Sequence, residues 1–211
     1  GWYAKWPAQT VNYVESHDDM CLLDRIARNP AEPSVAEIRA YKLALALTLS
    51  SIGVPMIAEG ADLLRTKRGV SNTYLRGDLN ALDYMRGEEY SGLRSWVRDL
   101  VKFRTSPAAK ALRLSEPAGE SYCAFFNSEN SPASGVMFNA DKSRKCRRVF
   151  AAFNPSASAV RLPIGDLDLD TFVQIADIDR FNPAGLGDDP FRAHGAIDMP
   201  PRAFALFVEK P

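Results

Sequence analysis

The sequence predicts an α+β fold whose two halves are of different types. Up to about residue 110, short apolar runs alternate with longer stretches of helical spacing, as in βα units. After Pro107 the chain changes to short apolar runs separated by turns rich in Gly, Pro, Asn and Asp, which is typical of an antiparallel β-sandwich. We therefore expect two domains, one of residues 1–110 and one of residues 111–211.

The first half contains two strand-like runs, each followed by helical spacing. Residues 11–14 are strand-like, and residues 20–27 are compatible with a helix. Residues 54–58 have the pattern of a short buried strand, and residues 88–105 return to helical spacing. The polar stretch 59–87 is too long for an ordinary connection inside a compact domain, so we expect it to be either a functional loop or disordered.

A long helix is expected between the two strand-like runs. Ser34 and Glu37 form the capping-box pattern S-x-x-E just before an apolar run, which marks a helix start. The helix should continue to about Ser51, and Gly53 is placed to end it as the glycine after the cap. Residues 43–49 are apolar nearly all round, which indicates burial rather than a solvated face.

The second half carries six apolar runs of strand length with turn residues between them. No fixed-period repeat is evident along the chain. The candidate strands are residues 122–126, 135–139, 148–153, 159–162, 171–175 and 204–208.

The first half contains too few units to close on itself. Two βα units cannot make a barrel, and an open parallel sheet needs neighbours on both edges. We therefore expect residues 1–110 to be a piece of a larger structure.

Composition excludes several classes of partner. The 211 residues include 26 basic and 26 acidic side chains, so the basic excess that favours nucleic acid or an anionic membrane is missing. The longest apolar stretch, residues 43–57, is interrupted by polar residues and is too short to span a bilayer. No signal peptide is visible at the start of the chain, and both a cytoplasmic and a secreted location stay open.

The thiols and imidazoles predict neither a metal site nor a cofactor. The three cysteines, Cys21, Cys123 and Cys146, are widely spaced and odd in number, which is a poor disulfide framework and has no zinc-ligand spacing. Only two histidines are present, too few for a histidine-rich metal cluster.

Several ordered motifs resemble the α-amylase-type glycoside hydrolases. The run VNYVESHD at 11–18 is similar to the late-barrel motif of that family, where a strand ends in a His-Asp pair. GVPMIAEG at 53–60 resembles the family's eighth barrel strand. LRTK at 64–67, NTY at 72–74 and DLNALDY at 78–84 follow in an order that resembles pullulanases and related debranching enzymes more than ordinary α-amylases.

The resemblance implies a specific architecture and chemistry. Residues 1–110 would be the C-terminal fragment of a (β/α)8 TIM barrel, its last two βα units, and residues 111–211 the family's C-terminal β-sandwich. Such enzymes hydrolyse α-glucans (glycogen, starch or pullulan) with retention, here at α-1,6 branch points, using two carboxyl groups across the scissile bond. The family's nucleophile and general acid lie on middle strands that this chain lacks, so we expect the chain alone to be inactive.

The same resemblance assigns site residues. Asp18 would be the family's third acidic residue, which stabilises the developing positive charge, and His17 would donate to a hydroxyl of the same sugar. Taken without its flanking residues, a His-Asp pair is more often a turn that caps the next helix, with Asp18 or Asp19 accepting backbone N–H groups. The predicted substrate-binding residues lie in the loop that follows the eighth strand: Asp62, Arg65, Lys67, Asn72, Tyr74, Asp78 and Asn80.

Other interpretations remain open at the level of sequence. The long loop could be solvated, with its charges paired among themselves. The second half could be a carbohydrate-binding or interaction module in which Tyr122, Phe125 and Phe126 present a stacking face. A same-family glucan transferase is also compatible with this part of a barrel. Finally, surface that the rest of a barrel would cover, especially around residues 43–49, should promote self-association.

Overall fold

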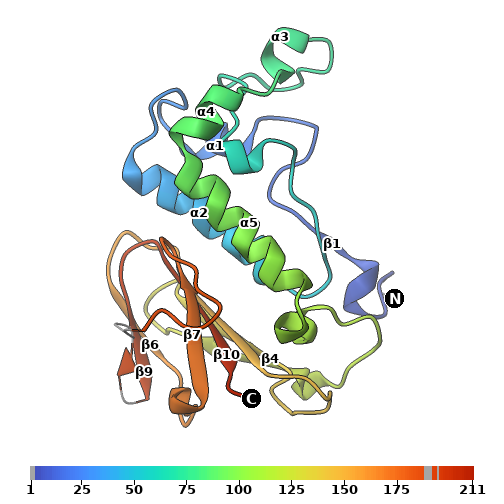
Figure 1. Cartoon of the computed structure of the whole chain (residues 1–211), viewed down its shortest axis with the longest axis vertical. Coiled ribbons are helices and arrows are strands. Elements are labelled where there is room, and N and C mark those ends of the chain that lie inside the picture. The colour runs from blue at the N-terminus through green and yellow to red at the C-terminus, as the bar shows by residue number, and fades with distance from the viewer. Residues whose placement is uncertain (1–2, 188–191, 194) are drawn as a thin grey trace.

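The computed structural model describes residues 3–187, 192–193 and 195–211. A mostly helical part, formed by the first half of the chain, lies against the larger of two antiparallel sheets formed by the second half (Figure 1). The α-helices are α1 (Leu22–Ile26), α2 (Val35–Ser50), α3 (Gly77–Asn80), α4 (Tyr84–Glu89) and α5 (Ser91–Thr105). The strands are β1 (Val11–Asn12), β2 (Val54–Pro55), β3 (Cys123–Asn127), β4 (Ser134–Phe138), β5 (Val149–Asn154), β6 (Val160–Pro163), β7 (Phe172–Asp177), β8 (Arg192–Ala193), β9 (Ala196–Met199) and β10 (Ala203–Glu209).

The first two strands form a short parallel pair. Val11 lies opposite Val54, and Asn12 lies opposite Pro55. The predictions of longer strands at 11–14 and 54–58 are wrong, because regular pairing covers only two residues of each run. In the part of the chain that the structure describes, each of these strands has one neighbour, so nothing extends the ladder.

Helix α2 begins as predicted and ends slightly differently. The Ser34 Oγ accepts from the Glu37 backbone N–H, and the Glu37 carboxylate accepts from the Ser34 backbone N–H at 2.7 Å, so the capping box is confirmed. The cap at the other end is Ser51, two residues before Gly53, so the prediction that this glycine directly follows the cap is wrong. Gly53 instead has φ +99° in the turn into β2, where a Cβ would lie 2.8 Å from the Thr10 Oγ1.

The second half of α2 is largely buried. Leu43, Leu45 and Leu49 are at most 8% exposed, because α1, α5 and the five-stranded sheet pack around them. Leu47 is 52% exposed, which corrects the prediction that this stretch is buried on every side.

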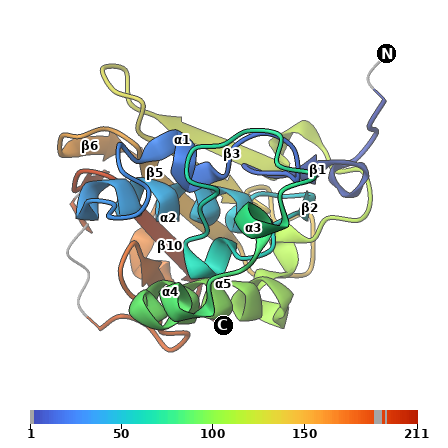
Figure 2. The same cartoon turned by 90° about the horizontal axis from the view of Figure 1, so that it is seen from above.

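The larger antiparallel sheet has the strand order β3-β4-β5-β10-β7 and is covered on both faces. On one face the helices α2 and α5 pack against it: the Trp96 ring meets the Phe204 ring edge-on, and the Trp96 Nε1–H donates to the Asp177 carbonyl at 3.0 Å. Figure 2 shows α2 lying over the sheet near β5 and β10, the strands that it contacts. The helical part and this sheet therefore share one apolar core.

The other face of that sheet packs against the three-stranded sheet β6-β9-β8. Phe150 and Phe207 of the larger sheet share a second apolar core with Leu162 and Ile197 of the smaller one. All six predicted strands of the second half are present, to within two residues at each end. Strands β8 and β9 were not predicted.

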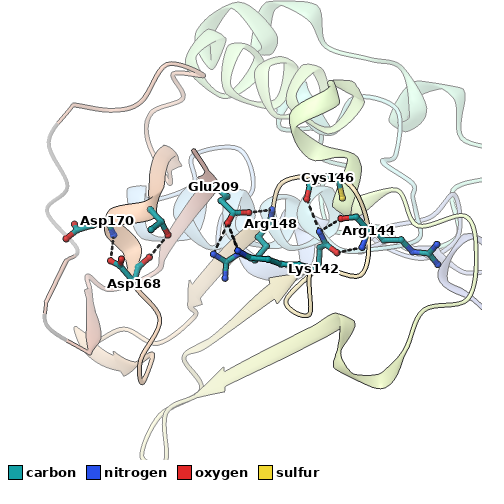
Figure 3. A network of polar contacts seen from close by, with 9 residues as sticks. Lys142, Arg144, Cys146, Arg148, Asp168, Asp170 and Glu209 are labelled. Carbon is teal, nitrogen blue, oxygen red and sulfur yellow. Dashed lines mark hydrogen bonds and ion pairs between the residues drawn. The ribbon is translucent and has the colours of Figure 1, made fainter. Parts of the chain in front are cut away.

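A cluster of charged side chains lies at one end of the larger sheet, where β5 begins and β10 ends (Figure 3). The Glu209 carboxylate accepts from the Arg148 Nη2–H at 2.8 Å and lies 3.5 Å from the Lys142 Nζ. Burial alone would raise the pKa of the Glu209 carboxyl. The hydrogen bonds from Arg148 and the charges of Arg148 and Lys142 outweigh that effect, so the pKa lies below its ordinary value. The neighbouring Asn139, buried with φ +59°, donates to the Arg144 and Cys146 carbonyls and so fixes the β4–β5 loop.

Candidate functional site

The candidate site lies where the parallel pair ends. Strands β1 and β2 run in the same direction, so the segments that follow them, 13–21 and 59–87, leave from the same edge. In α/β structures this edge is where ligand-binding loops gather, because the carboxyl ends of parallel strands meet there. Both segments contain the predicted site residues.

His17 and Asp18 form an exposed pair in the first of these segments. The His17 Nε2 lies 3.5 Å from the Asp18 Oδ1, and their side chains are 91% and 72% exposed. The capping interpretation of this pair is wrong for the described contacts, because the Leu22 backbone N–H at the start of α1 donates to the Glu15 carboxylate at 2.7 Å. The Asp18 carboxylate is thus left facing solvent beside the imidazole.

The second segment reaches back to the first through Lys67. Its Nζ donates to the His17 carbonyl at 3.3 Å and to the Asp19 carbonyl at 3.2 Å. The Ser71 Oγ–H donates to the Asp19 carboxylate at 3.3 Å, which adds a contact from the same loop. The backbone around Asp18 is therefore held from the side of the long loop.

Helix α1 anchors the long loop in return. The Asp24 carboxylate, in a residue only 7% exposed, accepts from the Lys67 backbone N–H at 2.8 Å and from the Thr66 Oγ1–H. Each segment thus supplies side-chain groups that bind the backbone of the other. We refer to Asp24, Thr66 and Lys67 as the clasp.

The rest of the long loop is folded and tied to itself, so the expectation of disorder is not met. The Arg65 guanidinium donates to the Glu59 and Asn80 carbonyls at 3.2 and 3.1 Å, and the Asn80 side chain also accepts from the Thr73 Oγ1–H at 2.7 Å. Leu64 is fully buried although its φ is +57°, a backbone conformation that costs about 1 kcal/mol or more for such a residue. This stretch is therefore an ordered platform rather than a solvated connection.

A cavity of about 700 Å³ opens on this platform between the loop and the segment after α1. Arg65 and Asp78 line it, together with Asn29, Leu79 and Arg86. The Arg65 Nε–H is buried without a hydrogen-bond partner among the described residues. Neither His17 nor Asp18 lines this cavity.

Three of the seven predicted loop residues make contacts within the site. Lys67 lies against the His17–Asp18 segment, and Arg65 and Asn80 bind each other within the platform. Four others lie apart from the His-Asp pair or point to solvent: Asp62 lies 3.8 Å from Arg94 of α5, Asp78 pairs with Arg76 at 2.7 Å, Tyr74 is 85% exposed, and Asn72 is exposed with φ +52°.

Sequence reasoning missed the residues that organise the site. Asp24 was read as part of an ordinary helix, and Thr66 and Glu15 were given no role. The signal for Asp24 was a carboxylate among the apolar residues of a short helix, where burial requires a hydrogen-bonding partner. That partner lies 43 positions away, so local pattern could not identify it.

The thiols and carboxylates of this part add no separate chemistry. Burial raises the pKa of the Cys21 thiol to about 12, with the charges of Glu15 and Asp24 adding to the effect, so this group stays protonated. All three cysteines are free. Over the described ranges, no group of three or more His, Cys, Asp or Glu side chains is arranged to hold a metal ion, and no helix is both long and apolar enough to cross a bilayer.

Comparisons with known proteins agree with the motif resemblance. No protein-family model matches the chain. The chain is 37% identical over 109 residues to a pullulanase of Bacillus subtilis (strain 168), a match that covers 51% of this chain and 15% of that protein. It is 30% identical over 187 residues to an isoamylase of Flavobacterium sp., covering 73% of this chain and 24% of that protein.

A solved structure extends the agreement to the fold. A pullulanase complexed with maltotetraose, from Anoxybacillus sp. LM18-11, superposes with a TM-score of 0.75 at 20% identity, covering 97% of this chain and 28% of that one. The chain therefore spans no more than about a quarter of the relatives it matches and a similar share of this structure. The predicted resemblance to pullulanases and related debranching enzymes is confirmed.

Proposed function

We propose, from the homology of this chain with pullulanases and an isoamylase, that it is part of an α-glucan debranching glycoside hydrolase. In this proposal residues 1–110 are the last two βα units of a (β/α)8 barrel, and residues 111–211 are a C-terminal β-sandwich. The short parallel pair β1–β2, with covering helices after each strand, supports the first assignment. The two antiparallel sheets with a shared core support the second.

The observation that carries the proposal is the exposed carboxylate of Asp18 in the irregular segment that follows the parallel strand β1. Glycoside hydrolysis passes through an oxocarbenium-like transition state, which a fixed negative charge stabilises. The carboxylate also accepts hydrogen bonds from sugar hydroxyls, and the adjacent His17 imidazole donates one to the same ring. The ordered platform 59–87 supplies outer contacts through Arg65, Tyr74 and its cavity.

The chain supplies one of the three acidic groups that such a site needs. The nucleophile and the general acid belong to barrel strands with no counterpart among these residues, so we expect no turnover of pullulan by the purified chain. A reducing-sugar assay with pullulan checks this. Hydrolysis that disappears in Asp18→Asn would contradict the expected inactivity while supporting the site.

Sugar binding tests the site directly. We expect a titration of the ¹⁵N-labelled chain with maltotriose to shift the amide resonances of residues 17–19 and of the platform 59–87. Asp18→Asn should abolish the shifts at 17–19, whereas Asp166→Asn, an exposed carboxylate in the second half, should leave them intact. A titration with no shift in either segment contradicts the proposal.

The same titration distinguishes the debranching site from a second candidate, a carbohydrate-binding module in residues 111–211. One observation favours that module. Phe125 on the edge strand β3 is 70% exposed and could stack on a sugar. Tyr122 is buried with its O–H donating to the Ala111 carbonyl, so it presents no stacking face, whereas Phe126 is half-buried and packs edge-on against Phe150. Shifts confined to strands β3 and β4 would favour the module over the debranching site.

We also propose that copies of the chain associate through apolar side chains of the first half. The exposed ones include Leu47 of α2 and Val11, Val54 and Met56 on or next to the parallel pair. Sedimentation velocity over a concentration series checks this. A single monomer coefficient at the highest concentration argues against association.

A further inference from the structure

Lys67 occupies an unusual position for a lysine. The residue is only 3% exposed, and the described hydrogen bonds of its Nζ run to two backbone carbonyls rather than to a carboxylate. Burying an ammonium group away from water is costly, and carbonyl oxygens offset that cost only if they are held in place. Such a group is therefore expected where the geometry of its acceptors matters.

The two acceptors are the residues on either side of Asp18. The Lys67 Nζ binds the carbonyls of His17 and Asp19 at 3.3 and 3.2 Å, so it spans the peptide units that carry the Asp18 side chain. Asp19 has φ +59°, a left-handed conformation that is uncommon for non-glycine residues, although Asp adopts it more readily than most, and neighbouring contacts stabilise it here. The ammonium is one such contact, and the Ser71 hydroxyl is another.

The lysine is itself held from the opposite side. Its backbone N–H donates to the buried Asp24 carboxylate at 2.8 Å, and Thr66 donates to the same carboxylate. Asp24 belongs to α1, the helix that directly follows the His-Asp segment. The clasp therefore closes a ring in which α1 fixes the loop and the loop fixes the backbone of Asp18.

We infer that Lys67 is a positioning residue for Asp18, which sets the direction of the carboxylate by holding the His17 and Asp19 carbonyls without touching the Asp18 side chain. The inference deepens the proposed function and rests on it for its meaning in catalysis. The rival explanation is a strut that contributes only to overall stability. If Lys67 positions Asp18, removing the ammonium should disturb residues 17–19 alone. If it is only a strut, the loss of order should extend to the rest of the fold.

The experiment compares variants of the full chain by NMR. Lys67→Met keeps most of the apolar stem and removes the ammonium, whereas Lys67→Arg keeps the charge and donors. Lys102→Met is the matched control, because Lys102 is an exposed lysine on α5. The readouts are ¹⁵N order parameters of residues 17–19 and of the five-stranded sheet, and the imidazole resonances of the chain's two histidines, His17 and His194.

We expect the order parameters at 17–19 to fall from about 0.85 to below about 0.6 in Lys67→Met, with the sheet unchanged. The His17 imidazole resonance should move, while Lys67→Arg should restore much of the wild-type pattern and Lys102→Met should match wild type. Retained order at 17–19 in Lys67→Met overturns the inference, and so does an equal loss in the sheet. If Lys67→Met does not fold, Lys67→Gln is read by the same criteria.

A maltotriose titration of the same samples separates this inference from the proposed function. Wild-type shifts at 17–19 that weaken in Lys67→Met support both. A wild-type chain that shows no response to the sugar contradicts the proposed site, while the order parameters still decide whether Lys67 positions Asp18.

Discussion

The helical part and the sheet part satisfy their backbone carbonyls in different ways. In the sheets, ladder hydrogen bonds along five- to seven-residue strands pair most of the groups, as β5 and β10 do over six opposed positions. In the helical part, among the residues that the structure describes, the ladder is limited to the two-residue pair β1–β2, and long irregular segments remain beside the helices. There, cationic side chains bind the carbonyls instead.

Arg104 is the largest example of this device. The residue is 5% exposed, and its guanidinium donates to the carbonyls of Leu49, Ser51, Gly53 and Leu112. Burial, with the nearby charge of Arg113 adding to it, lowers its pKa to about 10, still far above neutral pH. One side chain therefore joins the end of α2, the turn into β2 and the segment after α5.

The sheet part uses neutral amides where its ladders stop. The Asn154 side chain donates to the Ser158, Met199 and Pro200 carbonyls, much as Asn139 does in the β4–β5 loop. Asn139 binds carbonyls five and seven positions away within one loop, whereas Asn154 joins the end of β5 to the end of β9 and the segment between β9 and β10. The difference teaches that a part with little ladder depends on a few charged residues, whereas a part with long ladders spreads the same task over many backbone pairs.

The largest effect is expected from truncating a residue that packs against both parts. Phe204 of β10 contacts Trp96 of α5 and stacks on Phe153. We expect Phe204→Ala to lower the free energy of unfolding by about 3–5 kcal/mol, because it leaves a cavity between the parts. Urea unfolding with hydrogen exchange checks this. Faster exchange in the sheet with unchanged exchange in α5 would show that the two parts unfold independently.

Arg104→Met tests the role of the buried cation. We expect a loss of about 3 kcal/mol, because several carbonyls lose their donor and are only partly rehydrated. Arg98→Met is the matched control on the same helix, since Arg98 is exposed and pairs with Asp99, and it should cost less than about 0.5 kcal/mol. If the two variants lose the same free energy of unfolding in urea, the carbonyl contacts of Arg104 stabilise the fold no more than the exposed ion pair of Arg98 does.

Ser34→Ala tests a local element of the helical part. We expect a loss of about 1 kcal/mol, because the capping box at the start of α2 is removed. Ser91→Ala at the start of α5, where no side-chain cap is present, should be nearly neutral. If Ser34→Ala destabilises the fold in thermal unfolding as much as Arg104→Met does, the helical part depends on the cap of α2 as strongly as on the buried cation.

Glu209→Gln should have the smallest effect, and one that depends on pH. Because the folded-state pKa of Glu209 lies below its ordinary value of 4.5, the carboxylate stabilises the fold above that pH, and the contribution is lost as the pH falls through the folded-state pKa. We expect a loss of about 0.5 kcal/mol near neutral pH that disappears once the pH has fallen below the folded-state pKa. A loss in urea unfolding that stays the same from neutral to strongly acidic pH would rule out this carboxylate as its source.

Much of the architecture could be predicted from local pattern. Ser34 and Glu37 marked the start of α2, since capping is a contact between residues three apart. Apolar runs with turn residues marked six strands, because alternation and turn chemistry are local. Strand β9 escaped this reasoning because its four residues follow a segment without a clear pattern. The length of β1 and β2 also escaped it, since a run forms a strand only where a neighbour supplies the ladder.

The sequence by itself determined the change from a mostly helical half to an antiparallel β half, the capping of α2 and the resemblance to pullulanases that drew attention to His17 and Asp18. Tertiary structure alone decided how that pair is held, because the clasp joins Asp24 to residues 42 and 43 positions away. It also decided that Arg104 spans three segments and that Leu47 stays exposed on a helix that is otherwise apolar there. Hydrogen bonds between distant segments depend on where the packed elements bring them, and no local periodicity contains that information.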